Sequence, residues 1–247
     1  VITNIGTSHI GNLGSRENIA KAKCEIVKYQ RGKYFIAHDD ELIKKTVDFR
    51  GEKLFYSIKD VNILEKSANY SKFEYENNIY ELNVGGNYNI ENALSAIITG
   101  NKLGLTTEEI QKGLKNYKSI EKRWESVDAG GYEIINDSYN ANPESMRAFV
   151  DTVFELYNNY LLILGDMGEL GINEVQYHKE LGEYIFKKNS GAKVITVGNL
   201  SKNIAEPNFH TTEDAVEYIK NNISKNTKLF LKASRSMKFE QIIEMLK

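Results

Sequence analysis

The sequence predicts an α/β protein whose C-terminal half is built on a mostly parallel sheet. From about residue 121 onward, short apolar segments alternate regularly with longer segments of helical periodicity. Polar residues rarely interrupt the apolar segments, which is typical of strands that helices cover on both faces. The N-terminal half lacks this alternation and mixes helices with short strands rich in aromatic and β-branched residues.

The C-terminal half is expected to be Rossmann-like. Pro143 fixes one helix start, because proline is favoured at the first helical position and Asn142 before it is a good cap. No GxGxxG sequence follows the first strand, so dinucleotide binding is not indicated. The expected strands are 132–136, 160–164, 193–197 and 228–231, and the expected helices are 143–157, 174–189 and 237–246.

The N-terminal half is expected to contain three helices and an antiparallel patch of strands. A helix from about Glu17 to Tyr29 carries lysines on one side. Apolar residues recur at helical spacing from Asn89 to Leu103, and Gly104 follows where a helix C-cap belongs. A further helix is expected at 107–116, and the strands of the patch are expected at 34–37, 53–58, 68–75 and 79–84.

Charge and cysteine content exclude several classes of function. The 32 Lys and Arg residues against 34 Asp and Glu give a net charge of -2, so no field would gather nucleic acid or an anionic membrane. The single cysteine, Cys24, excludes an internal disulfide and fits a reducing cytoplasm. No run approaches the roughly 18 apolar residues of a membrane span. We expect a cytoplasmic globular protein, with a monomer favoured.

Two features near the N-terminus suggest a ligand site without defining it. His9 lies in a loop directly after an apolar strand end, where α/β proteins present ligand-binding groups. Taken alone, His9 is explained more simply as a locally bonded loop histidine. Lys21 and Lys23, on the helix that follows, are likewise explained by an exposed cationic face. Whether these residues form a ligand site must therefore be judged from other motifs.

A series of motifs in the right order makes the chain resemble the Mur ligase family over nearly its whole length. Thr3–His9 and Ala20–Ile26 resemble the second half of the family's central ATPase domain. Gly86–Leu94 resembles its adenine-contacting helix start, with Tyr88 in place of the usual histidine. Arg123 resembles the arginine that opens the C-terminal domain. The resemblance therefore implies a central-domain part at 1–119 and a Rossmann-like C-terminal domain at 120–247.

Three segments of the C-terminal half resemble one branch of the family, the ligases that add D-alanyl-D-alanine. These are Asp137–Pro143, Leu164–Gly171 and Lys232–Met237, and in the last of them Ala233 replaces a glycine. The resemblance implies that ATP phosphorylates a peptide carboxylate and that an amine then attacks the acyl phosphate. It implies UDP-MurNAc-tripeptide and D-alanyl-D-alanine as substrates, in the synthesis of the peptidoglycan precursor.

The resemblance also implies catalytic and nucleotide-contacting residues. His9 would bind Mg²⁺ or Mn²⁺, and Lys23 corresponds to a lysine that is carbamylated in many members, which would let it bind a hard cation. Arg123 would contact the ATP phosphates, because a planar guanidinium suits oxyanions. The residues expected at the adenosine part are Asn89 and Asn92 at the adenine and Asp137 at the ribose hydroxyls.

Substrate contacts are implied in the loops of the C-terminal half. Tyr139, Asn140 and Asn142 are candidates, although a turn with a helix cap explains these residue types equally well. His178 is interpreted instead as a packed or solvated helix residue. Further candidates for contact with the dipeptide are Ser234, Asp166 and Glu169. The alternative interpretation of Asp166 and Glu169 is that they are ordinary loop carboxylates without a role in binding.

Part of the expected machinery does not occur in these 247 residues. The family's G-T-x-G-K-T loop and a metal-binding glutamate precede the stretch that matches Val1 onward, and the first methionine is Met146. We therefore expect an upstream part, and we expect the 247 residues alone to be inactive. Two alternatives are another ligase of the superfamily, such as a folylpolyglutamate synthase or cyanophycin synthetase, and a non-catalytic nucleotide-binding homologue.

Overall fold

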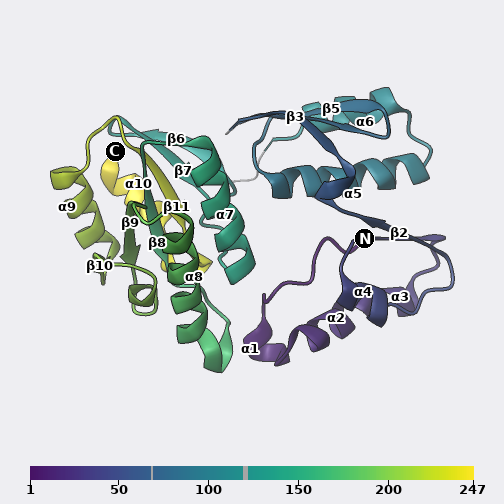
Figure 1. Cartoon of the computed structure of the whole chain (residues 1–247), viewed down its shortest axis with the longest axis horizontal. Helices are drawn as coiled ribbons and strands as arrows, with labels where there is room; N and C mark the ends of the chain where they lie inside the picture. The colour runs from purple at the N-terminus through teal and green to yellow at the C-terminus, as the bar shows by residue number, and fades with distance from the viewer. Residues whose placement is uncertain (68, 119–121) are drawn as a thin grey trace. The chain divides into compact units, whose positions relative to one another are not determined.

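The computed structural model describes residues 1–67, 69–118 and 122–247, and its chain divides into two compact units (Figure 1). The N-terminal unit is Val1–Lys118 and the C-terminal unit is Ser119–Lys247. The expected domain boundary, between residues 119 and 120, lies outside the described residues. Each unit has its own buried apolar clusters, so the two units are described separately.

The C-terminal unit is built on a six-stranded sheet in the order β10-β9-β8-β11-β7-β6. All neighbours are parallel except β6 and β7, which pair antiparallel at one edge. The expected mostly parallel sheet is thus confirmed, and β6 was not predicted. The strands are β6 (Glu125–Ala129), β7 (Tyr132–Asn136), β8 (Tyr160–Gly165), β9 (Val194–Val197), β10 (Asn208–Phe209) and β11 (Lys228–Lys232).

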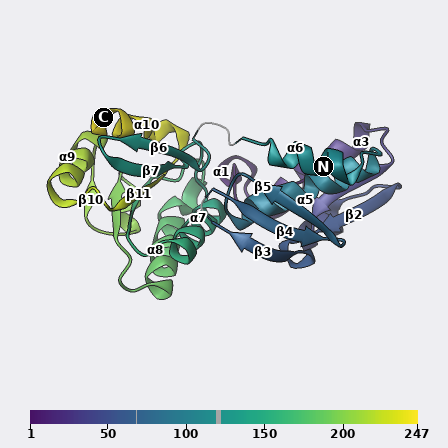
Figure 2. The same ribbon diagram turned by 90° about the horizontal axis from the view of Figure 1, so that it is seen from above.

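Helices cover both faces of this sheet (Figure 2). α7 packs against α8, and α9 packs against α10 on the opposite face. This arrangement follows from right-handed crossovers between parallel strands. The helices are α7 (Pro143–Leu156), α8 (Glu174–Lys188), α9 (Thr212–Asn222) and α10 (Glu240–Leu246), and short 3-10 turns lie at η2 (Gly171–Asn173), η3 (Ser201–Asn203) and η4 (Arg235–Met237).

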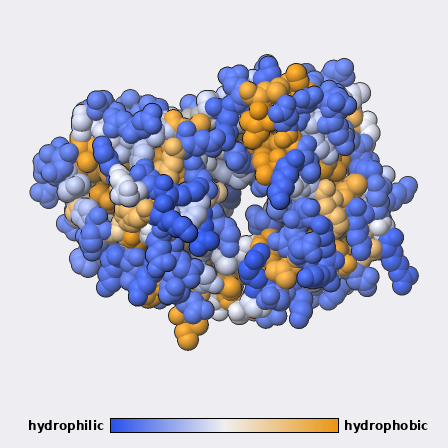
Figure 3. Space-filling view, in the orientation of Figure 1, coloured by the Kyte–Doolittle hydropathy of each residue, from blue (hydrophilic) through white to orange (hydrophobic). Residues whose placement is uncertain are grey.

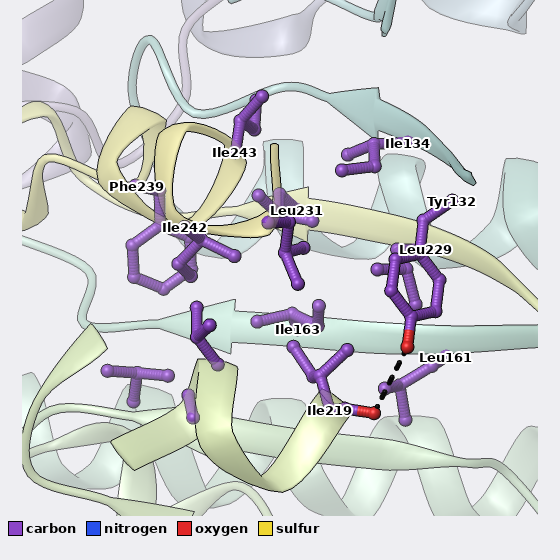
Figure 4. Close-up of a cluster of buried hydrophobic side chains, with 14 of the residues drawn as sticks. Tyr132, Ile134, Leu161, Ile163, Ile219, Leu229, Leu231, Phe239, Ile242 and Ile243 are labelled. Carbon is purple, nitrogen blue, oxygen red and sulfur yellow. Dashed lines mark hydrogen bonds between the residues drawn. The ribbon is translucent and has the colours of Figure 1, made fainter. Parts of the chain in front are cut away.

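Alternate residues of the strands form the core beneath α9 and α10 (Figure 4). Ile134, Ile163 and Leu231 point to this face, and all three are fully buried. Tyr132 is also fully buried, and its hydroxyl donates to the carbonyl of Ile219 at 3.3 Å and to that of Ile223 at 3.0 Å. The tyrosine therefore ties the end of α9 to the sheet without leaving its polar atom unpaired.

The N-terminal unit opens with a parallel arrangement that the sequence did not predict. β1 (Tyr34–His38) and β2 (Glu52–Tyr56) pair parallel, and Ile2 adds a parallel bridge to Ala37. The expectation that these strands belong to an antiparallel patch was wrong. The reason is α4 (Glu41–Thr46), which is capped by the Asp40 side chain and returns the chain between the two strands. Six residues are too few for helical periodicity to be visible in the sequence.

The antiparallel patch itself consists of the three strands that follow. β3 (Asn62–Lys66), β4 (Ser71–Tyr75) and β5 (Asn78–Leu82) pair in that order. β3 was not predicted, and residue 68, where the next strand was expected to begin, lies outside the described residues. The helices after the patch, α5 (Asn87–Lys102) and α6 (Thr107–Lys115), agree with the prediction, and Gly104 adopts the expected left-handed C-cap conformation at φ 84°.

The predicted helix from Glu17 to Tyr29 is divided in the structure. It forms α2 (Arg16–Cys24) and α3 (Ile26–Tyr29), with a break at Glu25, and a short α1 (Ile10–Leu13) precedes them. Ile19, Ala20 and Cys24 are the buried residues of α2. Among the described residues, no helix has the length and apolar character needed to cross a membrane.

Gly182 provides a test of the packing of α8. A Cβ at this position would lie 2.3 Å from the carbonyl oxygen of Ile204, and that backbone is not free to move aside. Gly182→Ala is expected to lower the free energy of unfolding by about 1–3 kcal/mol. Urea denaturation followed by circular dichroism measures this change.

Gly113→Ala is the matched control in another helix. Nothing lies within 4 Å of the Cβ that this substitution adds to α6, so it is expected to raise stability by about 0.5–1 kcal/mol. Equal effects of the two substitutions would contradict the packing argument.

Candidate functional site

The signature loops of the C-terminal unit gather at the carboxyl edge of its sheet. They follow β7, β8 and β11, three strands that lie side by side and run parallel. From β8 the chain proceeds outward to β9 and β10 and then returns to β11 on the other side of β8. In such sheets, ligands bind outside the carboxyl ends of the strands at this reversal of order. The loops after β8 and β11 therefore flank the expected binding crevice.

Ser234 joins the two loops that flank the reversal. Its backbone N–H donates to the carbonyl of Asp166 at 3.0 Å, and its Oγ accepts from the N–H of Gly168 at 2.6 Å. Ser234 is only 6% exposed, so its hydroxyl acts within the protein. Ala233 is accommodated here because the facing residue is Gly165, where a Cβ would come within 2.7 Å of the Ala233 Cβ.

Asp166 also has an internal role. Its Oδ1 accepts from the backbone N–H groups of Leu200 at 3.0 Å and Ser201 at 2.7 Å, and its Oδ2 accepts from that of Asn199 at 3.1 Å. The carboxylate thereby braces the loop after β9. The neighbouring position 198 requires a glycine, because its φ is 131° and a Cβ there would collide with the Asp166 carboxylate. Contact of Asp166 with the dipeptide amine stays a prediction.

His178 on α8 supports the same loop from beneath. It is fully buried, as the interpretation of a packed histidine requires. Its Nε2 accepts from the N–H of Met167 at 2.9 Å, and its Nδ1 lies 2.7 Å from the carbonyl of Glu174. These partners define a neutral ring with the proton on Nδ1. Burial lowers the pKa of His178 below its ordinary value.

Asp137 follows β7 and forms an ion pair with a buried lysine. Its Oδ2 accepts from Lys232 Nζ at 2.6 Å, and its Oδ1 accepts from the Trp124 N–H at 3.2 Å. Each oxygen retains a further lone pair, so a ribose hydroxyl remains a compatible partner. No role for Lys232 was predicted from the sequence. A charged residue at the end of an otherwise apolar strand was the available signal.

Arg123 lies against Tyr139. The guanidinium carbon is 4.2 Å from the centre of the Tyr139 ring, a cation–π geometry. Both residues are exposed at the carboxyl edge. The structure thus brings together Arg123, Asp137 and Tyr139, which are separate in the sequence.

The two asparagines of the loop after β7 act mainly on the backbone. Asn142 caps α7, its Oδ1 accepting from the N–H of Ser145 at 2.8 Å, so the cap interpretation is confirmed. Asn140 accepts from the N–H of Ala141 with its side chain at 2.8 Å and from Lys232 Nζ with its carbonyl at 3.1 Å. Glu169 is exposed at φ 60° in the neighbouring loop.

His9 and Lys23 lie in the N-terminal unit. His9 caps α1 in the left-handed conformation at φ 63°. Lys23 is an exposed residue overall, but its Nζ lies against the chain and donates to the carbonyl of Asn4 at 3.0 Å. Partial burial of this ammonium lowers the pKa of Lys23. The described ranges hold no cluster of three or more His, Cys, Asp or Glu suited to a metal.

A cavity of about 410 Å³ lies between α5, α6 and β5. Its walls are mostly apolar, and Asn89 and Asn92 contribute the amides on its α5 side. Apolar side chains gather on this part of the surface (Figure 3). Asn89 is held by a hydrogen bond to the carbonyl of Gly85 at 2.6 Å, whereas Asn92 is exposed. An apolar slot with a few amides suits a flat heterocycle.

Comparison with known proteins identifies the family of this chain. Residues 1–100 match the Mur ligase middle domain, and residues 122–243 match the Mur ligase glutamate ligase domain. The chain belongs to the Mur ligase family.

Named relatives narrow the comparison. The UDP-N-acetylmuramoyl-tripeptide–D-alanyl-D-alanine ligase of Bacillus subtilis (strain 168) is 36% identical over 100% of this chain, which spans 58% of that relative. MurF from Acinetobacter baumannii has a TM-score of 0.87 and 25% identity over 98% of this chain and 58% of that one. The MurF ligase of Thermotoga maritima, solved with ADP, shares the fold with a TM-score of 0.82 at 23% identity, over 99% of this chain and 60% of that one.

His178 predicts how stability depends on pH. Because its pKa is lowered in the folded protein, the unfolded chain binds a proton below about pH 6.5 that the folded chain resists. The free energy of unfolding should therefore fall as pH drops through 6.5, by at most about 1.4 kcal/mol per pH unit. Urea denaturation between pH 7.5 and 5.5 measures the fall.

His178→Gln is the comparison variant, and it should lose this part of the pH dependence. His38, whose pKa is raised by its hydrogen bond with Glu91, contributes in the opposite sense. It is present in both proteins, so the difference between them isolates His178. The same slope in both would contradict the assignment.

Proposed function

We propose that the chain forms part of an ATP-dependent amide ligase that adds D-alanyl-D-alanine to UDP-MurNAc-tripeptide in peptidoglycan precursor synthesis. The observation that carries the proposal is the gathering of three signature loops at one sheet edge, after β7, β8 and β11. The 36% identity to the Bacillus subtilis ligase over the whole chain supports the same activity. A cytoplasmic location agrees with soluble nucleotide substrates.

In this proposal each unit contributes residues of its own. Residues 1–119 would form the end of the central domain and residues 120–247 the acceptor domain. Asn92, with Asn89 beside it, would recognise the adenine at the apolar cavity, since amides pair with the edge of a base and apolar walls pack on its faces. Arg123 would meet the phosphates, and Asp137 the ribose hydroxyls.

ATP would supply the phosphoryl group that activates a peptide carboxylate for attack by an amine. A bound divalent cation, Mg²⁺ or Mn²⁺, would neutralise phosphate charge, with His9 as one ligand. Lys23 would serve the cation only after carbamylation, which forms a bond from a neutral amine to carbon dioxide and releases a proton. The lowered pKa of Lys23 favours that neutral amine.

The acceptor dipeptide would bind at the loops after β7 and β8. Glu169 is exposed there and offers an anionic partner for the dipeptide amine. Asp166 and Ser234 are already bonded to backbone groups, so they would act by holding the loop. Tyr139 and the loop of Asn140 and Asn142 would form the adjoining wall.

Asn92→Ala tests the nucleotide part of the proposal. Loss of the amide is expected to weaken adenosine binding to the chain about tenfold, which corresponds to one unreplaced hydrogen bond. Titration calorimetry with adenosine measures the affinity. Asn101→Ala on the same helix, outside the cavity lining, should leave it unchanged. Unaltered binding by the Asn92 variant would remove the cavity from the proposal.

Ligation itself requires an assay of the whole reading frame that encodes these residues. With ATP, UDP-MurNAc-tripeptide and D-alanyl-D-alanine, we expect phosphate release and a pentapeptide product, and no comparable reaction with L-glutamate as acceptor. The 247 residues alone should be inactive, because they contain no glycine-rich loop to cradle the β and γ phosphates. Preference for glutamate would instead favour a different ligase of the superfamily.

A further inference from the structure

We propose that Lys232 is a positioning residue for Arg123, acting through Asp137 and the turn that carries the arginine. This inference rests on the proposed function, in which Arg123 meets the phosphates of ATP. Lys232 ends β11, and Arg123 precedes β6, so the two are far apart in the sequence and separated in the sheet by β7. Hydrogen bonds connect them in two short routes.

The first link is the ammonium of Lys232 itself. The residue is 3% exposed, and its Nζ donates to Asp137 Oδ2 at 2.6 Å, to the carbonyl of Asp137 at 3.3 Å and to that of Asn140 at 3.1 Å. An ammonium has three protons, so its donor capacity is filled. Burial and saturation together remove Lys232 from direct contact with a ligand. Its effect must be exerted through the groups that it holds.

The first route passes through the Asp137 carboxylate. While Lys232 fixes Oδ2, Oδ1 accepts the N–H of Trp124 at 3.2 Å. Trp124 is buried against Phe149 and Phe230. A displaced carboxylate would therefore remove a hydrogen-bond partner from the partly buried N–H of Trp124, which is costly.

The turn held in this way is strained. Lys122 and Trp124, the two neighbours of Arg123, have φ values of 61° and 53°. Such values are unfavourable for residues with a side chain and persist only when the surrounding structure enforces them. The hydrogen bond to Asp137 is one of the contacts that enforce them, so the direction of Arg123 depends on it.

The second route passes through the loop after β7. Lys232 fixes the carbonyl of Asn140, and the adjacent residue Tyr139 donates its N–H to the carbonyl of Lys122 at 3.0 Å. The Tyr139 ring lies under the guanidinium of Arg123 at 4.2 Å. Stacking uses the face of the guanidinium, whereas its donors lie in the plane and suit phosphate oxygens. The turn that carries Arg123 and the Tyr139 ring on which its guanidinium stacks thus both depend on one buried lysine.

Lys232→Met tests the inference in the chain of 247 residues. We expect ATP affinity to fall about tenfold, because a misdirected Arg123 would no longer form its charged hydrogen bond with phosphate. Adenine affinity should stay unchanged, because the expected adenine contacts, Asn89 and Asn92, belong to the other unit. Emission from Trp124, the only tryptophan in the chain, should shift as its turn relaxes. Lys232→Arg, which keeps the charge, should recover most of the ATP affinity.

Lys228→Met is the matched control on the same strand. Lys228 pairs with Glu133 at 2.6 Å and lies at the opposite end of β11, so its loss should affect stability without changing ATP affinity or Trp124 emission. Equal effects of the two methionine variants on ATP binding would overturn the inference. So would unchanged affinity and emission in a folded Lys232→Met protein.

Two further outcomes, a failure of the variant to fold and a failure of the chain to bind nucleotide, can be distinguished from a failure of the inference. If circular dichroism shows that Lys232→Met does not fold, Lys232→Gln takes its place with the same expectations, because the amide keeps a polar end in the buried site. If the unaltered chain binds neither ATP nor adenine, the nucleotide part of the proposed function fails. Trp124 emission in the Lys232 and Lys228 variants then still decides whether Lys232 positions the turn.

Discussion

The parallel pairing of β8 with β11 is the constraint on which the C-terminal unit depends. These two strands lie at the centre of the sheet and are covered on both faces, yet they are separated in the chain by α8, β9, β10 and α9. Their pairing creates the reversal of strand order at which two signature loops meet. Parallel strands all direct their carboxyl ends to one edge. A third loop, after β7, therefore lies at the same edge.

Most polar residues at this edge are used to hold backbone. Asp166 accepts from three N–H groups, Asn142 caps a helix and Ser234 joins two loops. A loop at a sheet edge has few backbone partners of its own, and its N–H groups are costly when buried unpaired. Side chains that satisfy them make the loops rigid. A motif residue can therefore be required for a site without touching the ligand.

In the N-terminal unit, partial burial acts on the amine of Lys23. Lys23 is held against the chain with a lowered pKa, and Asn92 stands at the mouth of an apolar cavity. Removal of water from the amine of Lys23 favours its neutral form. In the C-terminal unit, the buried charge of Lys232 is paired with that of Asp137.

The sequence by itself determined the class of fold, the alternation of strands and helices from β7 onward, and the family. Apolar strands and amphipathic helices differ in period, and capping residues such as Asn142 act locally, so both are visible along the chain. Tertiary structure alone decided that β1 and β2 run parallel, and that Lys232 and His178 support the loops. The role of Lys232 depends on a contact between residues far apart in the sequence, its 2.6 Å pair with Asp137. The role of His178 depends on how α8 packs beneath the loop after β8, which the sequence pattern does not show.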